Sequence, residues 1–184
     1  WGGGVHTPVA VSLPSGSIAS SFASSGTGGT CVILANASMY CWGMSGDYFG
    51  IGNNNLNTPA APNFPGGRTA TSVSAGTLHT CAVLDNGSAY CWGQDSSGQL
   101  GNGIASTSIQ FTPVAVSLPS GRTASSIITG ANNACSILDN GSVYCWGGGV
   151  HTPVAVSLPS GSIASSFASS GTGGTCVILA NASM

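Results

Sequence analysis

The chain repeats itself over a long distance. Residues 1–39 return without a single change as residues 146–184, which sets a period of 145 positions. Internal repetition restricts the fold more than any single motif, because each repeat forms a unit that packs against its own copies. The sequence starts at Trp1 inside a Tyr-Cys-Trp-Gly motif and stops at Met184 directly before another. We therefore expect a window on a longer tandem array.

A smaller unit is marked by pairs of cysteines ten residues apart. From the second cysteine of one pair to that of the next, the steps are 50 and 54 residues, and 41 more complete the period. The pairs are Cys31/Cys41, Cys81/Cys91 and Cys135/Cys145, while Cys176 has no such partner in the sequence. Three unequal modules therefore make one period.

The segment 81–91, CAVLDNGSAYC, predicts a β-hairpin. Strand-forming residues flank Asp-Asn-Gly, which fits a three-residue loop with Gly87 in the left-handed conformation. In that register Cys81 lies opposite Cys91, within reach of a disulfide. Both faces of the hairpin are then largely apolar, as in a sheet stacked between two others. These faces carry Cys81, Val83, Ala89 and Cys91 on one side, and Ala82, Leu84, Tyr90 and Trp92 on the other.

Equivalent positions in the other modules predict their turns and cores. Gly141 has the same place in its turn as Gly87, whereas the first module has Ala-Asn-Ala around Asn36. Alanine in the left-handed region costs about 1 kcal/mol, so we expect a different turn there or mild strain. The aromatic residues beside the second cysteines are expected in the blade cores: Tyr40, Trp42, Tyr90, Trp92, Tyr144 and Trp146.

Two further segments complete a four-stranded unit. TPVAVSLPSG at 112–121 predicts a third strand with its proline at the start, and ASSIITG at 124–130 predicts a fourth. Four short antiparallel strands in about 40 to 55 residues are typical of a propeller-type blade. The expected organisation is 1–41 (the end of one blade with its cysteine hairpin), 42–91 and 92–145 (the second and third modules), and 146–184 (the start of the next period).

The pattern HTCAVLDNGSAYCWGQDSSGQLGNG, continued by TPVAVSLPSG and ASSIITG, resembles the repeat of the regulator of chromosome condensation family in its cysteine-containing bacterial extracellular form. Its best markers are Cys81, Cys91, Trp92, Gly93 and the run 98–103. The resemblance implies an all-β fold of propeller blades. It does not imply the nucleotide-exchange activity of the eukaryotic namesake, because nothing here matches that protein's charged exchange surface.

Two departures bear on how the blades are arranged. The family's known propellers close with seven blades, and seven is not a multiple of the three modules in one period. The third module also lacks the Gly-Gln-Leu-Gly segment after Trp146. An open, superhelical array fits a repeated three-blade unit at least as well as a closed ring of six blades. Part of a closed six- or seven-bladed propeller stays as the alternative.

The cysteines are better explained as disulfides than as metal ligands. Thiolate metal sites favour two to four residues between cysteines, whereas these pairs have nine. Disulfides indicate an oxidising compartment, so we expect an extracellular, secreted or cell-surface protein. Asp47 with the asparagines at 53–55, or Asp95 near Asn102, offers oxygen atoms for calcium without an acidic cluster. We predict no metal and no cofactor.

Candidate catalytic and modification residues are few. The three histidines, at 6, 79 and 151, have no consistent nucleophile or carboxylate beside them, so we predict no enzyme activity. Four Asn-x-Ser triplets match the N-glycosylation pattern, although the turns themselves also favour asparagine. They begin at Asn36, Asn86, Asn140 and Asn181.

Charge is almost absent. Only 3% of residues are charged, the net charge is −2, and no apolar run is long enough to span a bilayer. We therefore expect no nucleic acid partner and no membrane span, and little repulsion between copies. The leading prediction is a structural repeat protein whose disulfide-linked blades stack into an extracellular filament, with copies of itself as partners. The alternatives are a neutral domain kept soluble by glycans, or a propeller that binds a glycan or protein through the loops 44–57 and 94–111.

Overall fold

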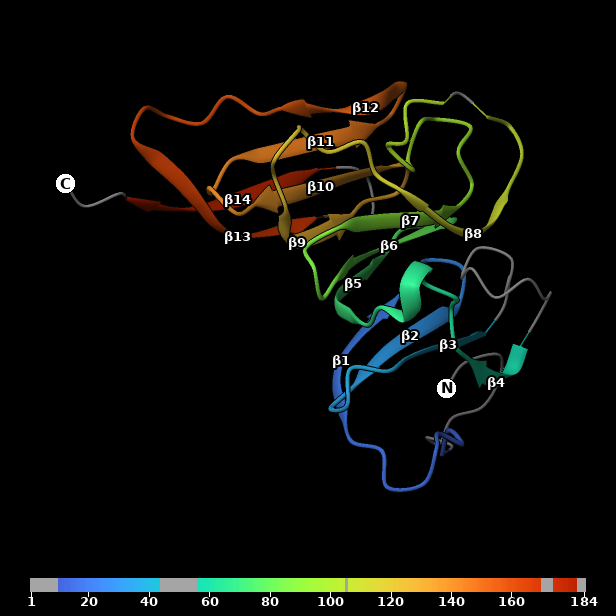
Figure 1. Ribbon diagram of the computed structural model, residues 1–184. Coiled ribbons are helices and arrows are strands. Elements are labelled where there is room, and N and C mark those ends of the chain that lie inside the picture. The colour runs from blue at the N-terminus through green and yellow to red at the C-terminus, as the bar shows by residue number, and fades with distance from the viewer. Residues whose placement is uncertain (1–9, 44–55, 105, 170–173, 182–184) are drawn as a thin grey trace.

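The structure is a computed structural model that describes residues 10–43, 56–104, 106–169 and 174–181 (Figure 1). It is built from antiparallel sheets, and the prediction of propeller-type blades is confirmed. Three sheets have four strands and the last has two, each in simple sequence order. The strands are β1 (Ala19–Ser24), β2 (Gly29–Leu34), β3 (Met39–Gly43), β4 (Leu56–Ala60), β5 (Ala70–Ala75), β6 (His79–Leu84), β7 (Ala89–Gly93), β8 (Gln110–Ala115), β9 (Ala124–Thr129), β10 (Asn133–Leu138), β11 (Val143–Gly147), β12 (Val150–Ala155), β13 (Ser162–Ser169) and β14 (Thr175–Asn181).

We call the sheets blades 1 to 4: β1–β4, β5–β8, β9–β12 and β13–β14. They follow one another through the molecule in chain order (Figure 1). A short 3-10 turn, η2 (Pro65–Gly67), lies between blades 1 and 2. In the described part of the chain, no helix has the length and apolar character needed to cross a membrane.

The phase of the blades differs from that of the expected modules. The sheets change between β4 and β5 and again between β8 and β9, so the bounds 42–91 and 92–145 cut each blade through its third strand. The segment TPVAV is thus the outer strand of one blade, while ASSIIT is the first strand of the next. Cysteine spacing measures the length of a repeat, but it does not tell which strands share a sheet.

The central hairpins of blades 1, 2 and 3 have the register that the sequence predicts. In blade 2, Ala82 pairs with Tyr90 and Val83 with Ala89, which places Cys81 opposite Cys91. The Leu84 N–H donates to the Ser88 carbonyl oxygen, 2.9 Å away, and closes the three-residue loop. Disulfides join the opposed cysteines in three blades: Cys31–Cys41, Cys81–Cys91 and Cys135–Cys145.

The turn of the first hairpin keeps the same geometry despite its alanine. Ala37 has φ = 64° and donates its N–H to Leu34, 2.8 Å away, just as Gly87 donates to Leu84 at 2.8 Å. Of the two outcomes expected for this turn, the structure shows the left-handed alanine. The conformation costs about 1 kcal/mol relative to glycine.

In blades 1, 2 and 3, a glycine with positive φ follows the tryptophan of the third strand. Gly93 has φ = 103°, and a Cβ there would lie 2.6 Å from the Leu78 carbonyl oxygen. The register between the third and fourth strands shifts at this point, between Cys91 and Gly93. The fourth strand, β8, carries Pro113 in its interior and not at its start. Proline is tolerated there because β8 is an edge strand beside a register shift.

Candidate functional site: the stacking faces of the blades

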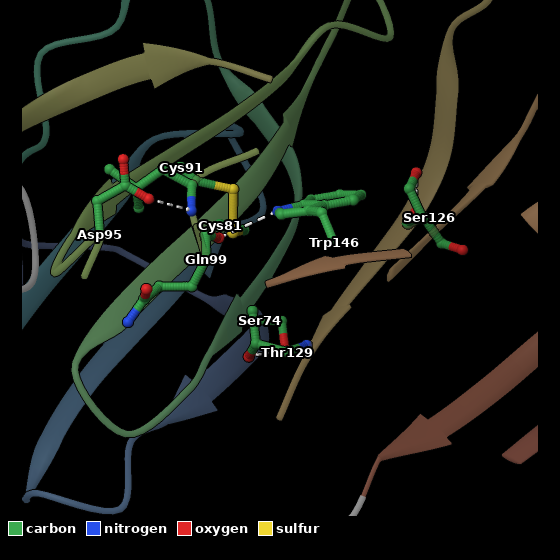
Figure 2. The surroundings of a disulfide bond; sticks show 10 residues. Ser74, Cys81, Cys91, Asp95, Gln99, Ser126, Thr129 and Trp146 are labelled. Carbon is green, nitrogen blue, oxygen red and sulfur yellow. Dashed lines mark hydrogen bonds between the residues drawn. A yellow bond between two sulfur atoms is a disulfide. The ribbon is translucent and has the colours of Figure 1, made fainter. Parts of the chain in front are cut away.

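Blades 1, 2 and 3 each present two apolar faces of different character. The cystine face carries the disulfide and the residues two positions inward, Val83 and Ala89 in blade 2, while the tryptophan face carries Trp92 with its neighbours. The cystine face of blade 2 packs against the tryptophan face of blade 3 in one buried cluster. Figure 2 shows the Trp146 indole of blade 3 directed toward the Cys81–Cys91 disulfide.

The same pairing recurs at the other junctions. Between blades 1 and 2, the cystine face with Cys31 and Cys41 shares a cluster with Trp92. Phe64 joins that cluster from the loop after β4, with its ring 5.8 Å from the Trp92 ring in an edge-on arrangement. Between blades 3 and 4, Cys135 packs in a smaller cluster with Ala164. Blades 1, 2 and 3 therefore each turn their cystine face toward the following blade.

The aromatic residues expected in the cores do not all lie equally deep. Trp92 and Trp146 are buried, but Trp42 is only half-buried because it lies on the outward tryptophan face of blade 1. The three tyrosines, Tyr40, Tyr90 and Tyr144, are also half-buried. Burial of the tryptophans therefore depends on a neighbouring blade, whereas the tyrosines are half-buried in all three blades.

A loop from blade 2 completes the junction with blade 3. The Trp146 Nε1–H donates to the Gln99 carbonyl oxygen at 3.0 Å (Figure 2). Leu100 beside it is fully buried in the same cluster, and its N–H donates to the Asp95 carboxylate at 3.1 Å. A Cβ at Gly101 would lie 2.7 Å from the Trp146 ring. The first half of the loop 94–111, which we expected to contact a ligand, is thus part of the stacking interface.

Polar contacts join successive blades at one end of their first strands. The Ser74 and Thr129 hydroxyls are 2.8 Å apart, linking β5 to β9. The Thr27 hydroxyl donates to the Thr77 carbonyl oxygen at 2.8 Å, linking blade 1 to blade 2. A groove of about 280 Å³ follows these ends and crosses all four blades. Its lining includes Ser24, Ala75, Thr129 and Ser169.

Charged side chains on the described surface occur in two matched ion pairs. Arg68 lies 3.3 Å from Asp85, and Arg122 lies 3.3 Å from Asp139. Asp95 has no exposed surface, and burial raises the pKa of its carboxyl group, although the Leu100 N–H and His151 act in the opposite direction. The described surface therefore offers no concentration of charge to a partner.

His79, for which the sequence predicts no catalytic role, lies buried between blades 2 and 3. A Cβ at Gly76 would collide with its ring and with the Gly130 carbonyl oxygen. Neither imidazole nitrogen makes a hydrogen bond of ordinary geometry. Burial lowers the pKa of His79 to about 4, while the Asn133 backbone acts in the opposite direction. The side chain is a packing element without access to a substrate.

The asparagines of the glycosylation pattern have a structural role in the turns. The Asn36, Asn86 and Asn140 Oδ1 atoms each accept the N–H of the residue two positions on, at 3.1 Å. This is an Asx turn, which explains asparagine at these positions without a glycan. Cys176 is exposed and unbonded. Some predicted positions lie outside what the structure describes: His6, the loop portion 44–55 with Asp47, and the side chain of Asn181.

These features define the class of protein: a tandem array of propeller-type blades held together face to face. Two family models match the sequence, both described as the regulator of chromosome condensation (RCC1) repeat, over residues 70–99 and 86–137. The chain therefore contains RCC1-type β-propeller repeats. The match includes the hairpin 81–91 and the loop that holds Trp146. No curated protein matches the sequence.

Solved structures agree on the fold. Human WBSCR16 superposes with a TM-score of 0.70 at 17% identity, over 85% of this chain and 43% of that one. Yeast RCC1 (Prp20), in a complex with Kap60, gives 0.65 at 18% identity, over 78% and 36%. The receptor kinase CR4 ectodomain of Physcomitrella patens gives 0.52 at 22% identity, over 83% and 34%. The chain spans less than half the length of each of these structures.

Proposed function

We propose that this protein is a structural repeat protein that builds an extracellular filament by stacking disulfide-linked β blades. The observation that carries the proposal is the order of the faces: a cystine face is turned toward the following blade at three successive junctions. An array of this kind has no intrinsic end, since each blade leaves an apolar face for another. The identity of residues 1–39 and 146–184 means that the segment that begins blade 1 returns in blade 4.

The low charge and the disulfides support the same proposal. A described surface whose exposed charges form two ion pairs gives little repulsion between neighbouring arrays. Three disulfides fit an oxidising location, which we propose to be outside the cell. The proposal assigns no catalytic activity to the chain.

Electron microscopy of the native material tests the filament. We expect fibres with an axial repeat that corresponds to three blades. Discrete rings without fibres would contradict the proposal. Treatment with a reducing agent should loosen the fibres, because each disulfide lies in a face that carries the stack.

A binding module is the second candidate, favoured by exposed apolar side chains near the end of the long blade-2 loop. Ile104 and Phe111 are both exposed, although the preceding residues 98–101 are buried. A glycan or protein ligand would contact this segment. Binding to a glycan array or to protein extracts that disappears in an Ile104→Ser, Phe111→Ser double variant would support this candidate.

A further inference from the structure

Two of the disulfides are each covered by a tryptophan from the following blade. The disulfide of blade 2 shares one buried cluster with Trp146, and the disulfide of blade 1 shares another with Trp92. The four sulfur-bearing side chains have no exposed surface, and neither tryptophan is more than 2% exposed. Both junctions lie between four-stranded blades. The pairing of an indole with a disulfide is therefore a repeated internal feature of the fold.

The junction between blades 2 and 3 shows how the two groups are held. The nitrogen-bearing edge of the Trp146 indole is directed toward the Cys81–Cys91 disulfide (Figure 2). The Nε1–H donates to the Gln99 carbonyl oxygen at 3.0 Å, which fixes the orientation of the ring. Leu100 fills the same cluster and has no exposed surface. Side chains in such a cluster are in van der Waals contact, so the ring and the disulfide meet without water between them.

Contact between an indole and a disulfide permits a reaction that neither group undergoes in the dark. An indole excited by light is a strong one-electron reductant, and the antibonding orbital of the S–S bond accepts one electron. Electron transfer of this kind falls steeply with distance and therefore requires contact. Water and dissolved oxygen compete poorly for the excited state of Trp146, because its side chain is only 2% exposed. The disulfide is the acceptor next to it.

We propose that near-ultraviolet light causes Trp146 and Trp92 to cleave the disulfides that they cover. One electron passes from the excited indole into the S–S bond, which breaks into a thiolate and a thiyl radical. The indole radical cation is acidic at Nε1, and its proton passes to the thiolate. The products are a thiol, a thiyl radical and a neutral indolyl radical, so one hydrogen atom in all moves from the indole to a cysteine. The chain supplies its own reductant, and the reaction is independent of the proposed filament.

Tryptophan fluorescence measures the electron transfer. We expect the Cys81→Ser, Cys91→Ser double variant to emit more tryptophan fluorescence than the wild type, because Trp146 has lost its electron acceptor. In a Trp146→Phe background, the same two cysteine substitutions should leave the emission unchanged. An unchanged emission in the first case, or an equal rise in both backgrounds, would contradict electron transfer from Trp146 to this disulfide.

Thiol labelling after illumination measures the bond cleavage. The full 184-residue chain is first treated to block Cys176, which is exposed and unbonded, so that it cannot exchange with a disulfide. It is then illuminated without oxygen at the long-wavelength edge of tryptophan absorption, denatured and treated with a maleimide. We expect mass spectrometry to find label at the cysteines of both covered disulfides, and none in a sample kept in the dark.

Two matched variants assign each cleavage to its own indole. Trp146→Phe should lose the label at Cys81 and Cys91 and keep that of blade 1, whereas Trp92→Phe should do the reverse. The proposal is overturned if both variants keep both sets of label, since the disulfides would then absorb the light themselves. If a variant does not fold, the wild type gives the answer through its action spectrum. A yield that follows tryptophan absorption as the wavelength changes supports the proposal, and a yield that follows disulfide absorption overturns it.

Discussion

The Trp146 side chain donates its Nε1–H to the backbone carbonyl of Gln99, 3.0 Å away and 47 residues earlier in the chain. The two residues belong to adjacent blades, and both are buried. A hydrogen bond between buried groups is costly to leave unmade on either side. This bond therefore holds the blade-2 loop against blade 3.

Trp146→Phe should lower the stability of the chain. The change removes the only donor of the indole and leaves the Gln99 carbonyl buried without that partner, which should cost about 1 to 3 kcal/mol of unfolding free energy. Urea unfolding monitored by circular dichroism measures the loss. Trp42→Phe is the matched control, since Trp42 is half-buried on the outward face of blade 1. An equal loss in both variants would show that the Gln99 contact does not matter.

The sequence was sufficient to predict the features that depend on neighbouring residues alone, namely the hairpin register and its disulfide. The opposition of Cys81 and Cys91 follows from alternation and from a three-residue turn, both of which are contained in eleven consecutive residues. Two apolar faces on one hairpin also predicted a sheet between two others, and the clusters on both sides of blade 2 confirm it.

Features that depend on contacts between residues far apart in the sequence were not predicted. The loop beginning at Asp95 reads as a variable surface loop, but Leu100 is buried because Trp146 of the next blade lies beside it. The run Gly-Gln-Leu-Gly, with one apolar residue between glycines, was the available signal. The burial of His79 depends on the missing side chain of Gly76, which no spacing rule indicates. The phase of the blades likewise depends on pairing between β7 and β8, across a long loop.

Removing one disulfide should weaken the chain without changing its fold. We expect Cys81→Ser with Cys91→Ser to lower the unfolding free energy by about 2 to 3 kcal/mol, because the unfolded chain regains the freedom of a ten-residue loop. Chemical denaturation measures the change. In mass spectrometry of the unreduced wild type, a thiol reagent should label Cys176 alone. Label on Cys81 or Cys91 would contradict the cross-strand pairing.

Exchanging the turn residues of two hairpins should have opposite effects. Ala37→Gly should raise the free energy of unfolding by up to about 1 kcal/mol, because Ala37 has φ = 64°, a value at which glycine is unstrained. Gly87→Ala should cost more than this amount, because Gly87 has φ = 76° and an added Cβ would lie 2.5 Å from the Cβ of Thr123, the residue before β9. Thermal unfolding of the two variants measures both. A stabilising Gly87→Ala would be incompatible with the described contact between blades 2 and 3.

Acid should destabilise the chain through His79. Its pKa in the folded protein is about 4, below the ordinary 6.5, so the unfolded chain takes up a proton at this residue before the folded one does. The unfolding free energy should therefore be unaffected by His79 above about pH 6.5 and fall by about 1.4 kcal/mol per pH unit between pH 6.5 and 4, a total of about 3 kcal/mol.

The His79 contribution is separated from that of other groups by a variant. Asp95 acts in the opposite direction, since its raised pKa makes the folded chain hold a proton more tightly as the pH falls. His79→Gln keeps Asp95 and removes the titrating imidazole, so the difference in slope between wild type and variant belongs to His79. Urea unfolding at half-unit steps from pH 7 to 4 measures both slopes. Parallel curves would mean that His79 is accessible to protons in the folded chain, contrary to its position between blades 2 and 3.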